Sequence, residues 1–117
     1  MAEIDIRDNR AQGRFEAYEG DELVGVVAYF VLAAAPAALV AVHTVVERGH
    51  EGKGIGGALV KEFYETAARE GVPVVPLCPY AARWAQRHPD EAAVAPAAAE
   101  ETVRAAEAQL KADSARW

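Results

Sequence analysis

The pattern of apolar and polar positions predicts strands in the first half of the chain. Residues 4–7 alternate apolar and polar side chains, as an edge strand does, and residues 14–18 predict a second short strand. The long apolar run over residues 23–32 is typical of a central strand. Residues 33–37 connect this run to a fourth strand over residues 38–46. We therefore predict an antiparallel meander of four strands.

The second half changes to a helical pattern after a glycine-rich loop over residues 47–57. A helix is predicted over residues 58–70, with apolar side chains recurring every three or four positions and Gly71 ending it. The apolar residues 72–77 predict a fifth strand. Because a helix crosses between them, the fourth and fifth strands should run parallel. The expected fold class is α/β (α+β), with a mixed sheet followed by C-terminal helices.

The C-terminal quarter is rich in alanine and predicts two more helices. Residues 80–87 have helical composition and Pro89 should end that helix, while residues 91–96 read as a link. A final helix is expected over residues 97–115. Its apolar face is thin, formed by Val103, Ala106, Leu110 and, at its end, Trp117. Docking on the domain, packing on a partner and fraying all remain open for this helix.

Composition and charge exclude several classes of function. The 117 residues suit one domain, and a net charge of −6 without a basic run argues against binding nucleic acid. No apolar run reaches about 18 residues, so no membrane span is expected. The single cysteine cannot form an intrachain disulfide, and the acidic N-terminus lacks a signal-like core. We expect a cytoplasmic protein.

The glycine loop is the strongest candidate binding site, because the first turn of a helix presents unpaired backbone N–H groups to an anion. The phosphate loop of NTPases does not fit, since Glu47 stands where its first glycine is required. Gly52, Gly54 and Gly57 match G-x-G-x-x-G, but the loop before them is long and no acid ends the next strand. A dinucleotide fold is therefore disfavoured. The alternative without a ligand is that the glycines let helix and strand pack closely.

A third family fits better. The segment Glu51-Gly52-Lys53-Gly54-Ile55-Gly56 resembles the acyl-coenzyme A loop of the GNAT acetyltransferase superfamily, whose pattern is Gln/Arg-x-x-Gly-x-Gly/Ala. Further blocks are similar to the small YjdJ-type GNAT proteins: Arg14-Phe15-Glu16, Gly25-x-x-x-Tyr29, His43-Thr44, Val74-Val75-Pro76-Leu77-Cys78-Pro79-Tyr80 and Arg87-His88-Pro89. The resemblance covers roughly residues 4–90. It implies a minimal acyl-CoA-binding domain over residues 1–90, with residues 91–117 a linker and helix of the same domain.

The resemblance implies that acetyl-CoA lies where the fourth and fifth strands diverge, with no metal. The pyrophosphate would bind at the loop, chiefly to the backbone N–H groups of residues 52–57, and the pantetheine amides would pair with the fourth strand. The implied cofactor-binding residues are Val45, Val46, Glu51, Gly52, Lys53, Gly54, Ile55, Gly56, Gly57 and Tyr80. Glu51 departs from the family's Gln or Arg, and a carboxylate there is unfavourable unless it points away from the phosphates.

Two residues are candidates for the chemistry of acetyl transfer to an amine. Cys78, at a strand end beside a helix start, would be an acyl-accepting nucleophile or a small buried residue lining the CoA arm. His43 would be a general base or a hydrogen-bonded core residue. Trp84 occupies the position where much of the superfamily has a proton-donating Tyr, so we expect it to pack.

The predicted function is an acetyl-CoA-dependent N-acetyltransferase with an unidentified amine acceptor, either a small molecule or a protein. The alternative is a CoA-binding module with little turnover that acts through a partner. It is favoured by the lack of the pair of helices that wall the acceptor site in larger members. The sequence leaves both a monomer and a homodimer open.

Overall fold

The computed structural model describes residues 4–32 and 37–116, and within them five strands form one mixed sheet. The strands lie in the order β1 (Ile4–Asn9), β2 (Arg14–Glu19), β3 (Glu22–Val31), β4 (Leu39–Val46) and β5 (Val74–Pro76). The first four pair antiparallel, and β5 pairs with β4 in parallel. The predicted mixed sheet is therefore confirmed. Most of the predicted connection at residues 33–37, and Trp117, lie outside the described residues.

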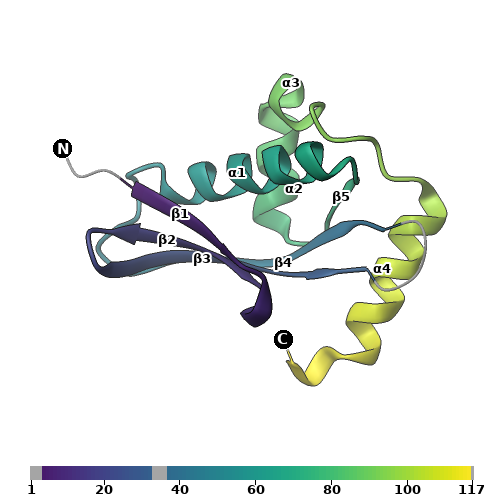
Figure 1. Cartoon of the computed structure of the whole chain (residues 1–117), viewed down its shortest axis with the longest axis horizontal. Helices are drawn as coiled ribbons and strands as arrows, with labels where there is room; N and C mark the ends of the chain where they lie inside the picture. The colour runs from purple at the N-terminus through teal and green to yellow at the C-terminus, as the bar shows by residue number, and fades with distance from the viewer. Residues whose placement is uncertain (1–3, 33–36, 117) are drawn as a thin grey trace.

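The helices cover both faces of the sheet. Figure 1 shows α1 (Ile55–Glu70), α2 (Pro79–Arg87) and α3 (Pro89–Ala92) on one face, and α4 (Glu100–Ala112) against the other face near β5. We call these the inner and outer faces. Short 3₁₀ turns occupy Arg10–Gln12 and Ser114–Arg116. Among the described residues, no helix combines the length and apolarity needed to cross a membrane.

Several element boundaries differ from the prediction. Helix α1 begins at Ile55 rather than residue 58, so two loop glycines lie in its first turn, where the buried Ile55 side chain anchors the helix to the sheet. Strand β5 is three residues long rather than six. Pro89 ends α2 as predicted but also starts α3, because proline is well suited to the first helical position. Helix α4 is shorter at both ends than residues 97–115.

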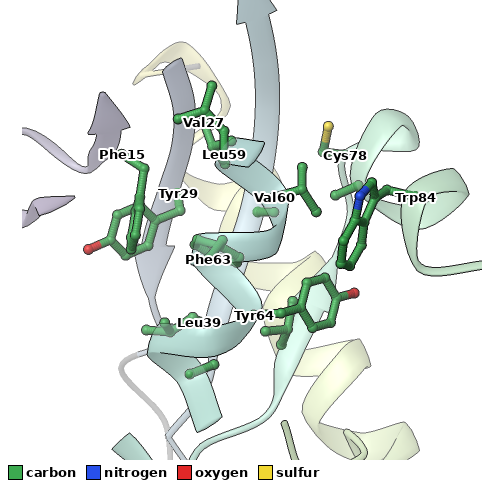
Figure 2. Packing of buried hydrophobic residues seen from close by; sticks show 14 of the residues in the cluster. Phe15, Val27, Tyr29, Leu39, Leu59, Val60, Phe63, Tyr64, Cys78 and Trp84 are labelled. Atoms are coloured by element: carbon green, nitrogen blue, oxygen red, sulfur yellow. The ribbon is translucent and has the colours of Figure 1, made fainter. Parts of the chain in front are cut away.

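The main core lies between α1 and the inner face of the sheet. The rings of Phe15, Tyr29 and Phe63 pack edge to face with centroid distances between 5.2 and 5.4 Å. Figure 2 shows these three side chains among the buried residues around α1. Near the head of α1, a Cβ on Gly25 would lie only 3.0 Å from Cγ2 of Ile55. The glycine in β3 therefore allows the helix to approach the sheet closely.

A second, smaller core lies under α4 on the outer face. Ala106 is fully buried there, and Val103 and Leu110 pack beside it. The sheet contributes Phe30 and Val40, among others. The predicted apolar face is confirmed for these three α4 residues, and of the alternatives left open by the sequence, α4 docks on the sheet.

Candidate functional site

Strands β4 and β5 separate where the resemblance places the thioester. They pair only from Leu39 to Ala41 on β4, against Val74 to Pro76 on β5. One further bond, from Cys78 N–H to the Ala41 carbonyl at 2.9 Å, ends the contact. Beyond it β4 continues to its end without β5 beside it. We call this opening between the two strands the notch.

A β-bulge in β4 lies at the start of the notch. His43 pairs with Ala28 of β3, but Ala41 pairs with the next residue, Tyr29, so that Val42 has no partner of its own. Because side chains alternate between faces along a strand, one extra residue reverses the alternation for everything beyond it. Ala41 packs in the inner core and Val42 in the outer one, and the reversal follows immediately.

The bulge decides which side chains face α1. Thr44 and Val46 lie on the inner face, because Thr44 contacts Cys78 and Val46 packs against the inner core. His43 and Val45 lie on the outer face with their β3 neighbours, and Val45 is 53% exposed. The sequence named Thr44 only within the His43-Thr44 block and not as a site residue, because a bulge leaves no local mark in an apolar run.

Cys78 and Thr44 meet at the inner edge of the notch. The Cys78 sulfur lies 3.3 Å from the Thr44 hydroxyl oxygen, and the cysteine is only 2% exposed. Cys78 is also the residue at the N-cap of α2, as the sequence predicted from its place between strand and helix. The two predicted catalytic residues are not brought together, since His43 is exposed on the outer face.

The main chain of β4 also alternates in direction. The Val45 carbonyl oxygen would lie 3.3 Å from a Cβ on Gly25, and the Glu47 N–H donates to the Val24 carbonyl, so both groups point at β3. Successive residues of a strand point their N–H and C=O groups to opposite sides, so those of Thr44 and Val46 point away from β3, to the open side of the strand. Thr44 and Val46, rather than Val45, present backbone donors and acceptors to the notch.

The head of α1 carries unpaired amides. Gly54 occupies the N-cap position with φ of 79°, a left-handed conformation that favours glycine, and no side chain caps the helix. The first amide bonded to the loop is that of Ala58, which donates to the Gly54 carbonyl at 3.0 Å. Within the described part of the chain, the N–H groups of Ile55, Gly56 and Gly57 have no acceptor. The helix therefore begins with three N–H groups that no group of the described chain accepts from.

Ile55 and Gly56 border a cavity of about 420 Å³ between the loop and the notch. Its walls contain most of the predicted cofactor residues and two residues that sequence reasoning did not select, Thr44 and His50. The predicted residues that line it are Val46, Glu51, Gly52, Gly54, Ile55, Gly56 and Tyr80. Val45, Lys53 and Gly57 do not line it.

Lys53 does not line the cavity, and its ammonium lies beside two other side chains. Its Nζ lies 3.7 Å from the Glu19 carboxylate and 3.3 Å from Nδ1 of His50. Both partners belong to segments beside the β2–β3 turn, since His50 also approaches Glu22 at 3.5 Å. The lysine is therefore held towards that turn, and Glu51 remains as an exposed carboxylate at the rim of the cavity.

Tyr80 and Trp84 have different environments on α2. Tyr80 is 39% exposed and lies over the head of α1, where a Cβ on Gly56 would be 2.7 Å from its hydroxyl oxygen. Trp84 is buried and stacks between Tyr64 and His88, with centroid distances of 5.5 and 4.8 Å. Figure 2 shows the indole beside the Tyr64 ring. The prediction that Trp84 packs is confirmed.

Tyr64, on α1, is buried and stacks against Trp84. Burial raises the pKa of its hydroxyl to about 12, so the phenol stays neutral near neutral pH. No cavity at the notch includes its side chain. In residues 4–32 and 37–116, no three His, Cys, Asp or Glu side chains gather as metal ligands would.

Comparison with known protein families finds a match for most of the chain. The family model described as GCN5-related N-acetyl-transferase matches residues 14–94. No curated protein matches the chain. The matched segment begins at β2 and ends just after α3, so it contains the notch, the glycine loop and the cavity, and leaves out β1 and α4.

Proposed function

Because the chain belongs to the GCN5-related N-acetyltransferase family, we propose that it binds acetyl-CoA at the head of α1 and transfers the acetyl group to an amine. Family membership supports acyl transfer in general, and acetyl-CoA is the donor that the family usually uses. The His43-Thr44 pair and the segment from Cys78 to Tyr80 further support assignment to the YjdJ-type subfamily.

The observation that carries the proposal is the row of unpaired amides at the head of α1, two of which belong to residues that line the cavity. Ile55, Gly56 and Gly57 offer three N–H groups at the positive end of the α1 dipole, and no side chain competes for them. A diphosphate needs several donors converging on closely spaced oxygens, which this geometry supplies. Glu51 at the rim adds an unfavourable charge, and its exposure allows it to rotate away from the phosphates.

The pantetheine arm would enter the notch as an additional strand. The peptide groups of Thr44 and Val46 face the open side of β4, so they can pair with the two amides of the arm. This would bring the thioester between Thr44 and the start of α2, where Cys78 lies. A backbone N–H of this row that the arm leaves unpaired can donate to the oxyanion that forms during transfer.

In direct transfer, the amine nitrogen attacks the thioester carbonyl, the carbon–sulfur bond breaks and CoA leaves as a thiolate. The amine loses a proton, for which His43 is the candidate acceptor from the outer face of the sheet. In a relay, the Cys78 thiolate attacks first, the carbon–sulfur bond to CoA breaks and CoA leaves as a thiolate, so that Cys78 becomes S-acetylated. The amine then attacks this new thioester, loses a proton and releases the Cys78 thiolate. The Thr44–Cys78 contact at the notch supports the relay, whereas the exposure of His43 supports direct transfer.

A second candidate is a CoA-binding module that works through a partner. The observation that favours it is the uncovered outer face around His43. Helix α4 packs over Phe30, Val40 and Val42 but leaves Val45 53% exposed. An acceptor site on this face would need walls from another molecule.

Calorimetry with acetyl-CoA, together with thiol release in the presence of a panel of amines, tests both candidates. Binding with amine-dependent release supports the enzyme, and binding without release supports the module. Failure to bind acetyl-CoA or CoA at millimolar concentration contradicts both. Mass spectrometry after rapid quenching separates the routes, since only the relay leaves an acetyl group on Cys78. Direct transfer should survive in Cys78→Ser and fall in His43→Gln.

A further inference from the structure

Two arginines of α2 stand beside the glycine loop, next to the cavity already described. Tyr80, Arg83 and Arg87 follow one another at i, i+3 and i+7, so they share one side of the helix. A hollow of about 90 Å³ is lined by these three residues and Trp84. A larger hollow of about 340 Å³ extends from it to the head of α1 and includes Gly54 and Lys61.

The two guanidinium groups have no partner in the described part of the chain. Four other arginines do pair: Arg7 with Asp5, Arg10 with Glu70, Arg14 with Glu16 and Arg69 with Glu62. Arg48 and Arg104 are exposed singly in other segments, whereas Arg83 and Arg87 stand together on one side of α2. Arg83 and Arg87 are exposed and four residues apart, a spacing at which like charges repel along a helix. In a chain of net charge −6, an unpaired cationic pair of this kind favours an anionic ligand.

The hollow and the cofactor cavity are contiguous. Gly54 and Tyr80 line both of them. A ligand whose diphosphate rests on the α1 amides, with one arm in the notch, would extend its other arm over Tyr80 towards Arg83 and Arg87. Among the residues that line the larger hollow, the acid is Glu91, and its carboxylate lies 3.6 Å from the Lys61 ammonium rather than beside an arginine.

In CoA, the arm on the far side of the diphosphate is adenosine with a 3′-phosphate. Arginine forks match the oxygens of a phosphate monoester, and an exposed tyrosine ring offers a surface for adenine. We infer that Arg83 and Arg87 bind the 3′-phosphate of CoA, so that the protein distinguishes CoA from dephospho-CoA. The inference rests on the proposed function, because it requires the diphosphate at the head of α1.

Calorimetry with CoA and with dephospho-CoA tests the inference. The wild-type chain should bind CoA about 10- to 100-fold more tightly than dephospho-CoA, as expected for charge-assisted hydrogen bonds to one phosphate. In the double variant Arg83→Gln/Arg87→Gln, CoA affinity should fall to about that of dephospho-CoA, which itself should change little. The matched control, Arg104→Gln/Lys111→Gln, removes two exposed cations from α4 on the opposite face and should keep the wild-type ratio.

Each other outcome overturns the inference in a distinguishable way. Equal binding of CoA and dephospho-CoA by the wild-type chain refutes it while leaving the proposed function intact. An equal loss for both nucleotides in the α2 double variant refutes the assignment of these arginines to the 3′-phosphate. If neither nucleotide binds the wild-type chain, the proposed function fails together with the inference.

Discussion

The hydroxyl oxygen of Thr44 lies 3.3 Å from the sulfur of Cys78, and this contact joins the end of β4 to the start of α2 across the notch. It exists because Val42 bulges out of β4. Without the bulge, His43 would face the cysteine and Thr44 would face the outer side. A single unpaired residue thus selects which side chain meets the thiol.

Replacing Thr44 with Val should slow the reactions of Cys78. The hydroxyl can donate a hydrogen bond to a thiolate at this position, and losing a bond of about 1 kcal/mol corresponds to roughly a fivefold change in rate. The measurements are the rate of alkylation of Cys78 by iodoacetamide and the rate of acetylation by acetyl-CoA. Thr44→Ser keeps the hydroxyl and should restore both rates. Wild-type alkylation in Thr44→Val would show that the contact has no effect on the thiol.

Replacing Gly56 with Ala should displace Tyr80. The new Cβ would lie 2.7 Å from the tyrosine hydroxyl oxygen, and the exposed ring can rotate away, so the free energy of unfolding should change by less than about 1 kcal/mol. CoA binding, measured by calorimetry, should weaken about 10-fold because Tyr80 lines the cavity.

Gly57 offers the matched substitution for stability. A Cβ there would be 3.6 Å from Nε1 of Trp84, an ordinary contact, so Gly57→Ala should stabilise the chain by about 0.5–1 kcal/mol through helix propensity. A thermal melt compares the two variants. Destabilisation by Gly57→Ala, or unchanged CoA affinity in Gly56→Ala, would contradict this account of the helix head.

Glu16 should make the stability of the chain depend on pH in the acid range. It is only 4% exposed, and burial raises the pKa of its carboxyl, but hydrogen bonds from Arg14, Asn9 and Tyr18 outweigh this and hold the pKa below its ordinary value of 4.5. Because the pKa of Glu16 is lower in the folded state than in the unfolded state, the carboxylate stabilises the fold at pH values above its unfolded pKa. That stability is lost as the pH falls through the folded-state pKa.

The measurement for Glu16 is urea unfolding between pH 7 and pH 3. Glu16→Gln should be less stable than wild type by about 1–3 kcal/mol at pH 7, and the difference should shrink below about pH 4.5. Glu107→Gln, at an exposed position of α4, serves as the control and should parallel the wild-type curve. A constant gap between Glu16→Gln and wild type would exclude the carboxylate as the source.

The docking of α4 can be tested with a pair of identical substitutions. Ala106→Asp places a carboxylate in the fully buried outer core and should cost about 3 kcal/mol or more in the free energy of unfolding. Ala108→Asp makes the same change at an exposed position two residues further on and should cost less than about 0.5 kcal/mol. Similar denaturation midpoints for both variants would show that α4 does not dock in solution.

Local sequence signals predicted most of the fold because they depend on near neighbours. Alternation along residues 4–7, the apolar run of β3 and the three-to-four spacing in α1 each act over a few positions. The same local signals did not predict where the elements begin and end, as the start of α1 shows. Gly56 and Gly57 argue against a helix by propensity, yet tertiary packing of Ile55 starts α1 before them.

The candidate site divides in the same way. The sequence by itself determined that a glycine-rich loop with unpaired amides leads into α1, because glycine conformation is a local property, whereas the packing of Ile55 decided at which residue the helix begins. Only the tertiary structure decided that Thr44 rather than His43 meets Cys78, that Lys53 is held by Glu19, and that Arg83 and Arg87 stand unpaired beside the loop. The physical reason is that cross-strand register and ion pairing join residues far apart in the chain, and no short window of sequence contains both members of such a pair.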